Sequence, residues 1–214
     1  YTKEQNLIIH GDKGLFPKYD FVARKKFNSS KEYFDENGGV YKSILAQTAK
    51  RLVPTIGVYF SQNSPSSSIS VNIPTKPIKK VISIPNIYNS IENCFEEIAL
   101  VDEHCSRLID NFTKKFPNVL KNELPLNTNG FESIINMCAK VLGLNDAKEF
   151  EDMALSTNLS SGIQIDMKLV NLDGINYLDY RRVVQSMMAY KMANVDNIML
   201  IYSFYESLSE FICN

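Results

Sequence analysis

The sequence predicts an α+β fold, in which a small β-containing part at residues 1–86 precedes a mainly α-helical part at residues 87–214. Two features predict this division. Before residue 87, short β-branched runs are bounded by proline or serine, as strands often are. After it, apolar residues recur at helical spacing. The 214 residues are 44% hydrophobic and 22% charged, so the chain is long enough for one large core or two small ones.

Three runs in the first part have the composition of strands, at residues 56–60, 69–71 and 81–84. Shorter apolar runs at 7–9 and 20–22 are weaker candidates. β-Branched residues favour the pleated backbone, and each of the three main runs lies next to turn-forming residues. One helix interrupts the strands, because apolar residues recur at helical spacing after Gly39 until Pro54 stops the pattern.

A single long helix is predicted at residues 91–116. Apolar residues occupy every seventh position from Ile91 to Phe112, and a second apolar stripe runs beside them. Pro117 would end the helix. The combined stripe is wide, which favours the interior of a helical bundle over a two-stranded coiled coil.

Four further helices are predicted after this one. Three of them lie at residues 131–142, 147–155 and 177–192, and the last begins after Asp196, a good N-cap. Between the second and third of these helices, alternating apolar residues within 160–171 are typical of a short strand.

Charge is distributed unevenly around a net of −1. Residues 1–90 carry 13 Lys and Arg against 6 Asp and Glu, a net of +7, and residues 91–214 carry 10 against 18, a net of −8. A basic first part is compatible with nucleic acid, with docking on the acidic second part, or with docking on a partner. The basic residues occur in short groups with few aromatic residues between them, which favours an ordinary solvated surface.

The cysteines and the hydropathy pattern indicate an intracellular protein, and we expect a cytoplasmic location. No apolar run has the length of a transmembrane helix, so no membrane partner is expected. The four cysteines show no metal-binding spacing and are interpreted as reduced thiols, three of them in apolar helical positions. They are Cys94, Cys105, Cys138 and Cys213.

Catalytic signatures are weak throughout the sequence. His10 and Asp12 follow an apolar run, where loops often hold acid–base groups. They have no second acid–base cluster to work with, and a surface turn is the better interpretation. The sequence has no phosphate-binding P-loop, zinc spacing or nucleophile elbow. We therefore expect a protein that is not an enzyme and has no metal or other cofactor.

The stretch LDGINYLDYRRVVQSMM at residues 172–188 resembles the second half of an EF-hand of the calmodulin and myosin light-chain kind. Ile175 matches the residue that bridges paired loops, Asp179 the closing acid, and Tyr180 the aromatic that opens the exiting helix. Val183, Val184 and Met187 match the apolar face of that helix. Upstream, Asn127, Asn129 and Gly130 are similar to part of a first loop. The resemblance implies a pair of helix–loop–helix units.

The same stretch departs from the EF-hand pattern at its ligand positions. Calcium requires six to eight oxygen ligands, several of them anionic, and these loops do not supply them. Gly174 is displaced by one residue from the required turn position. In the second loop, the first, third and fifth positions are Lys168, Val170 and Leu172; in the first loop, Pro125 and Asn136 replace the opening and closing acids. The resemblance therefore implies a fold without calcium.

Methionines cluster on the last two predicted helices, where they are either core filler or the lining of a groove for an amphipathic helix. From this we predict a non-enzymatic protein-interaction or assembly subunit, whose helical half binds a partner helix or packs in a larger complex. The alternative is a nucleic-acid-associated protein that uses the basic first part. The candidate partner-binding residues are Met187, Met188, Met192, Ile198, Ile201, Tyr205 and Leu208.

Overall fold

The computed structural model describes residues 40, 41, 44, 45, 47, 48, 53–60, 67–87, 90–121 and 130–213. The weaker strand candidates at 7–9 and 20–22, and the turn with His10 and Asp12, lie outside these residues. So do residues 125–129 of the first EF-hand-like loop, whereas residues 130–136 are described. The described residues between 40 and 47 are helical, in agreement with the helix predicted before Pro54.

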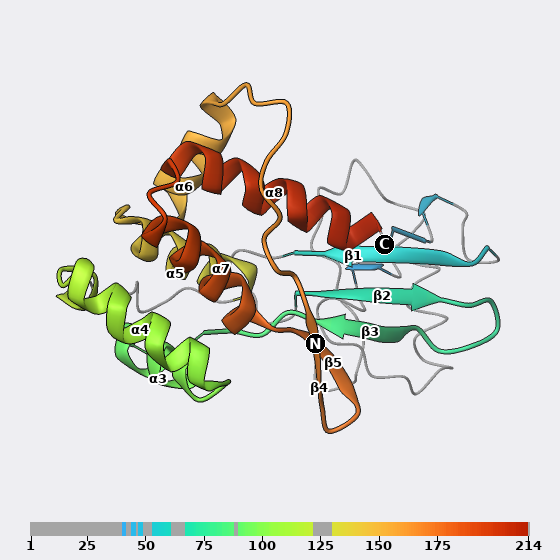
Figure 1. The fold of residues 1–214 in the computed structure, drawn as a ribbon. Coiled ribbons are helices and arrows are strands. Elements are labelled where there is room, and N and C mark those ends of the chain that lie inside the picture. The colour runs from blue at the N-terminus through green and yellow to red at the C-terminus, as the bar shows by residue number, and fades with distance from the viewer. Residues whose placement is uncertain are drawn as a thin grey trace, which may run out of the picture.

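A five-stranded mixed sheet forms one side of the molecule (Figure 1). The strands are β1 (Thr55–Tyr59), β2 (Ser68–Asn72), β3 (Lys79–Ser83), β4 (Leu169–Leu172) and β5 (Ile175–Leu178), in the spatial order β1-β2-β3-β5-β4. The three main strands predicted from the sequence are confirmed. Their pairing is antiparallel from β1 to β3, whereas β3 and β5 are parallel.

The β3–β5 pair crosses the predicted boundary between residues 86 and 87. Ile82 lies opposite Asn176 and Ser83 opposite Tyr177, so strands from both parts of the sequence belong to one sheet. The two predicted parts are therefore joined structurally at this point. Sequence spacing does not reveal this pairing, because the two strands are separated by more than eighty residues.

Among the described residues from Ile91 onward, six α-helices and one short 3-10 helix lie mainly beside the sheet and at the ends of its strands (Figure 1). They are α3 (Ile91–Ala99), α4 (Glu103–Lys115), η1 (Val119–Lys121), α5 (Phe131–Leu142), α6 (Ala147–Ser156), α7 (Tyr180–Met192) and α8 (Asn197–Cys213). The predicted α+β class is confirmed. None of the helices in the described part of the chain is long and apolar enough to cross a membrane.

The prediction of one long helix at 91–116 is wrong, because this stretch forms two helices, α3 and α4. Asp102 is the N-cap of α4, and its carboxylate accepts a hydrogen bond of 2.8 Å from the amide of Cys105. Leu100, at the end of α3, is 85% exposed. A capping carboxylate at this point starts a new helix, and the wide apolar stripe is divided between two helices that pack on each other.

The hydrophobic core lies among the helices, with α5 at its centre. Almost every side chain of α5 is buried, and α6, α7 and α8 contribute fully buried Phe150, Met187 and Phe204. Asn136 of α5 accepts a hydrogen bond of 2.6 Å from the amide of Ala147, at the first turn of α6. The residue that stands at the closing-acid position of the first EF-hand-like loop is thus a buried contact between two helices.

The second EF-hand-like loop forms a β-hairpin. Leu172 and Ile175 are directly paired, and the two residues between them, Asp173 and Gly174, have φ values of 51° and 81°. Positive φ at both central residues is the geometry of a two-residue type I′ turn, for which Asp-Gly is a preferred sequence. The bridging residue Ile175 therefore pairs within its own hairpin, and residues 157–168 before it are not helical, in contrast to a helix–loop–helix.

Residues 157–168, which we call the strap, connect α6 to β4 and pass along α8 and α7 (Figure 1). Side chains of these helices accept hydrogen bonds from the strap amides: Glu206 from Gly162, Ser203 from Ile163, Ser207 from Ile165, and Ser186 from Asp166. A Cβ atom at Gly162 would lie 2.6 Å from Ser203 Oγ, so glycine is required for this close approach. The short strand predicted here begins only at Leu169.

Candidate functional site

The predicted partner-binding residues lie largely inside the protein. Four of the seven are core residues: Met187, Met188, Ile201 and Leu208. The apolar stripes of α7 and α8 are used for packing within the molecule, so these four side chains offer no surface to a partner helix. The other three retain some exposed surface: Met192, Ile198 and Tyr205.

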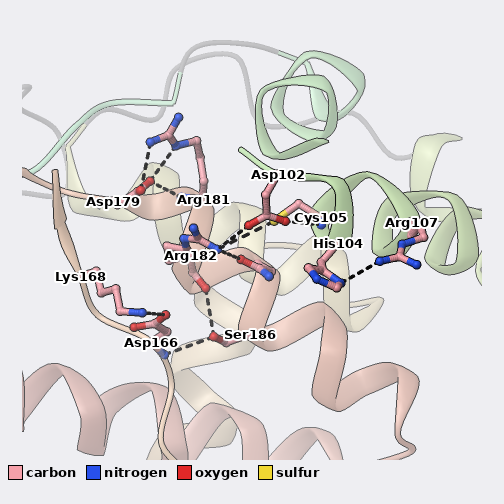
Figure 2. Close-up of polar contacts among 11 residues, drawn as sticks. Asp102, His104, Cys105, Arg107, Asp166, Lys168, Asp179, Arg181, Arg182 and Ser186 are labelled. Carbon is pink, nitrogen blue, oxygen red and sulfur yellow. Dashed lines mark hydrogen bonds and ion pairs between the residues drawn. The ribbon is translucent and has the colours of Figure 1, made fainter. Parts of the chain in front are cut away.

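A cluster of charged and polar side chains joins α4, α7 and the strap (Figure 2). Arg182 of α7 lies 3.4 Å from a carboxylate oxygen of Asp102 and donates to Gln185 at 2.9 Å. Ser186 donates to the Arg182 carbonyl at 3.0 Å and accepts from the amide of Asp166. The cluster therefore holds three separate segments of the chain in register.

Asp179, matched above to the closing acid of an EF-hand, is the N-cap of α7. It is buried, and its carboxylate accepts hydrogen bonds from Arg181 Nε at 2.7 Å and Nη2 at 3.0 Å (Figure 2). With its charge balanced by a neighbouring guanidinium, this carboxylate serves to start a helix. Tyr180, the next residue, donates its hydroxyl to Glu97 of α3 and so ties α7 to that helix.

The buried cysteines have little thiolate character. Burial raises the pKa of Cys94 and Cys138 to about 12. Burial also raises the pKa of Cys105, and the Asp102 carboxylate beside it adds to this effect. A neutral thiol is a poor nucleophile and a poor metal ligand. Within the described residues, no group of three or more His, Cys, Asp or Glu side chains is placed to hold a metal ion.

Among the described residues, five exposed large apolar side chains lie on strands of the sheet: Ile56, Val58, Leu169, Leu172 and Ile175. Residues directly opposite each other in paired strands, and residues two apart in one strand, share a face. By this register, Leu172 and Ile175 lie on one face with Val170 and Tyr177, and we call these four residues the hairpin face. Leu172 is 54% exposed and Ile175 is 45% exposed.

A second apolar surface lies at the other end of the sheet and on its opposite face. Ile56 pairs with Val71, which in turn pairs with Lys79, and Val58 lies two residues from Ile56. We call these four residues the outer strand face. Ile56 is 71% exposed and Val58 is 45% exposed. On the reverse side of β1, the ring of Tyr41 packs directly against Gly57 and its hydroxyl donates to the Thr55 carbonyl.

Sequence reasoning missed both surfaces, although part of the signal was present. In β1, Ile56 and Val58 alternate with Thr55, Gly57 and Tyr59. The two apolar residues are the exposed ones in this strand, and the other three are partly covered. Alternation identifies two faces of a strand but does not say which one is covered. The cover depends on contacts such as that between Tyr41 and Gly57, which are distant in sequence.

No protein-family model and no curated protein sequence matches this chain. Among solved structures, it is similar to part of full-length HypF, determined in a phosphate- and nucleotide-bound form. The two share 11% sequence identity with a TM-score of 0.57, over 91% of this chain and 29% of the HypF chain. This chain therefore corresponds to less than a third of HypF, and the similarity is one of fold.

Proposed function

We propose that this protein is a non-enzymatic interaction or assembly subunit, and that it binds protein partners through the exposed apolar surfaces of its sheet. The supporting observation is the contrast in exposure between helices and strands. Most apolar side chains of the helices are buried, whereas Ile56, Leu172 and Ile175 point into solvent from regular strands. Large apolar side chains clustered on one surface often mark contact sites between proteins.

Two further features are consistent with this proposal. The hairpin face is presented on a tight two-residue turn that fixes the register of β4 and β5, so its apolar side chains are held in place before a partner arrives. The matched part of HypF is one section of a much longer chain. In HypF, a fold of this kind is therefore joined to further parts of the same polypeptide.

The experiment replaces exposed apolar residues by threonine, which keeps the preference for strand structure. One variant carries Leu172→Thr and Ile175→Thr, and a second carries Ile56→Thr and Val58→Thr. We expect the free energy of unfolding of each variant, measured in urea, to lie within about 1 kcal/mol of that of the parent protein, since exposed sites contribute little to stability. We also expect at least one of them to lose proteins that co-purify with the parent, as measured by quantitative mass spectrometry.

Leu100→Thr is the matched control, because Leu100 is exposed but lies between α3 and α4, away from the sheet. Its set of co-purifying proteins should equal that of the parent. If both sheet variants keep every partner, the proposed function is wrong. If the material that co-purifies is nucleic acid released by salt, the basic part of the chain is the contact site and the alternative function applies.

A further inference from the structure

The outer strand face is apolar with a basic edge. Lys79 lies in the same cross-strand row as Ile56 and Val71, and Lys76 lies in the adjoining turn. Both lysines are exposed and form no ion pair with any residue in the described ranges. Residues 37–90 contain six Lys and Arg and no Asp or Glu, so no acidic side chain within that segment balances this edge.

The outward surface of α6 has the complementary character. Leu155 is 86% exposed, and on a helix it neighbours Asp152 and Glu151, three and four residues earlier. An open hollow of about 470 Å³ lies beside them, lined by seven residues: Asn145, Asp146, Lys148, Glu149, Asp152, Met153 and Ser156. We call Asp146, Glu149, Glu151, Asp152 and Leu155 the acidic helix face.

Two carboxylates of this face repel a neighbouring carboxyl group. Partial burial raises the pKa of the neighbouring Glu132, and the carboxylates of Glu151 and Asp146 raise it further. A cation placed here would relieve that repulsion. Lys148 is the one basic residue in the sequence from 146 to 156, against four acidic ones.

One molecule cannot bring these two surfaces together. The acidic helix face lies at the end of the molecule away from β1, β2 and β3, and α6 packs on α5 and α8 (Figure 1). We propose that the outer strand face of one copy of this protein binds the acidic helix face of a second copy. Ile56 and Val58 would then cover Leu155, while Lys76 and Lys79 would face Asp152 and its acidic neighbours. This inference rests on the proposed function and names a partner for it.

Two properties follow from this arrangement. The contact joins two different surfaces, so it is head-to-tail, and a bound pair leaves one surface of each kind free for further copies. Its charged edge is exposed to solvent, so salt weakens it, because the screening length falls from roughly 14 Å at 50 mM to about 4 Å at 500 mM ionic strength.

Sedimentation velocity of the full chain tests the proposal. At about 50 mM salt the average mass should rise with protein concentration, and at about 500 mM it should return to that of a monomer. One variant, Lys76→Glu with Lys79→Glu, reverses the outer strand face. A second, Asp152→Lys, reverses the acidic helix face. We expect each alone to weaken association more than about tenfold, since like charges now meet.

The decisive measurement is an equal mixture of these two variants. Each retains one intact surface of the opposite kind, so the mixture should associate where either variant alone does not. A contact between two copies of the same surface would not be rescued in this way. Lys114→Glu with Lys121→Glu is the matched control, because these lysines are exposed on α4 and η1, and it should associate like the parent.

Three outcomes would overturn the inference: a parent protein that stays monomeric, association that ignores both variants, or a mixture that fails to associate. The proposed function is judged separately, by the threonine variants and the proteins that co-purify with the parent. A monomeric parent that loses another protein on Leu172→Thr and Ile175→Thr would reject the second copy as partner and retain the interaction role.

Discussion

Most large apolar side chains of the helices are buried, whereas several of those on the strands are exposed to solvent. Among the helices, Phe150, Met188 and Phe204 have no exposed surface. On the sheet, Ile56 and Leu172 are mainly exposed, although both belong to strands with regular pairing. In β2, the apolar Ile69 is buried together with the polar residues Ser68, Ser70 and Asn72.

This difference separates what stabilises the fold from what is free to bind. Burial of apolar surface contributes about 25 cal/mol per Å², so the closely packed helices supply most of the hydrophobic stabilisation. The exposed strand residues contribute little to the folded state and retain their apolar area for a partner. Substitutions in the two regions should therefore separate stability from binding.

The largest expected effect is that of Phe204→Ala. Its ring contacts those of Phe131, Phe150 and Tyr205, with centroid distances of 6.0, 5.4 and 5.3 Å. Removing it from the core should lower the free energy of unfolding by about 3–5 kcal/mol. Urea denaturation measures this loss. Ile56→Thr, the counterpart on the sheet, should change stability by less than about 1 kcal/mol; a similar loss at both positions would contradict the division of roles.

A smaller loss is expected for Ser207→Ala, where α8 holds the strap. Ser207 Oγ accepts a hydrogen bond of 2.8 Å from the buried amide of Ile165. Alanine would leave this amide without an acceptor, which costs about 1–3 kcal/mol. Ser209→Ala is the control, because Ser209 is exposed on the same helix and the change in helix propensity is equal. Equal stability of the two variants would show that the strap does not depend on this contact.

Elements with strong local signals were predictable from sequence. The helix at 131–142 and the N-cap at Asp196 are confirmed at those residues, since apolar spacing and a capping side chain act within a few positions. The break between α3 and α4 was missed because the apolar spacing continues through Asp102. The structure shows that α3 ends at Ala99 and that Asp102 caps the start of α4, so the same residue pattern serves two packed helices.

The candidate site could not be predicted, for a different reason. The parallel β3–β5 pair and the packing of Tyr41 on Gly57 join residues that are distant in sequence. Such contacts decide which face of a strand is covered, so they decide where apolar residues are exposed. The Asp-Gly turn before Ile175 was visible in the sequence, but the same dipeptide fits both a hairpin and the resemblance to a calcium-binding loop.

The pH dependence of stability also distinguishes the helices from the sheet, because the buried thiols all belong to the helices. The pKa of Cys94 and Cys138 is about 12 in the fold, against an ordinary value of 9.0. Between these values the unfolded chain releases the thiol protons and the folded chain keeps them, so stability should fall as pH rises above 9. Urea denaturation from pH 8 to pH 10 measures the slope. Cys138→Ala should make it shallower, whereas Cys213→Ala, at an exposed position, should leave it unchanged.

The smallest effect is expected at Glu132, which lies beside the acidic helix face. Its pKa is raised by partial burial and then by the carboxylates of Glu151 and Asp146. Glu151→Gln removes one of these charges and should lower the pKa of Glu132. Carbon NMR of the side-chain carboxyl measures this pKa. Asp152→Asn is the control, because the Asp152 charge is not among the causes of this shift. Because a raised carboxyl pKa means that the folded chain binds the proton more tightly, the ionised group costs stability as pH rises above its ordinary value, and Glu151→Gln should reduce that cost. A pKa that does not move would show that the Glu151 carboxylate does not act on Glu132.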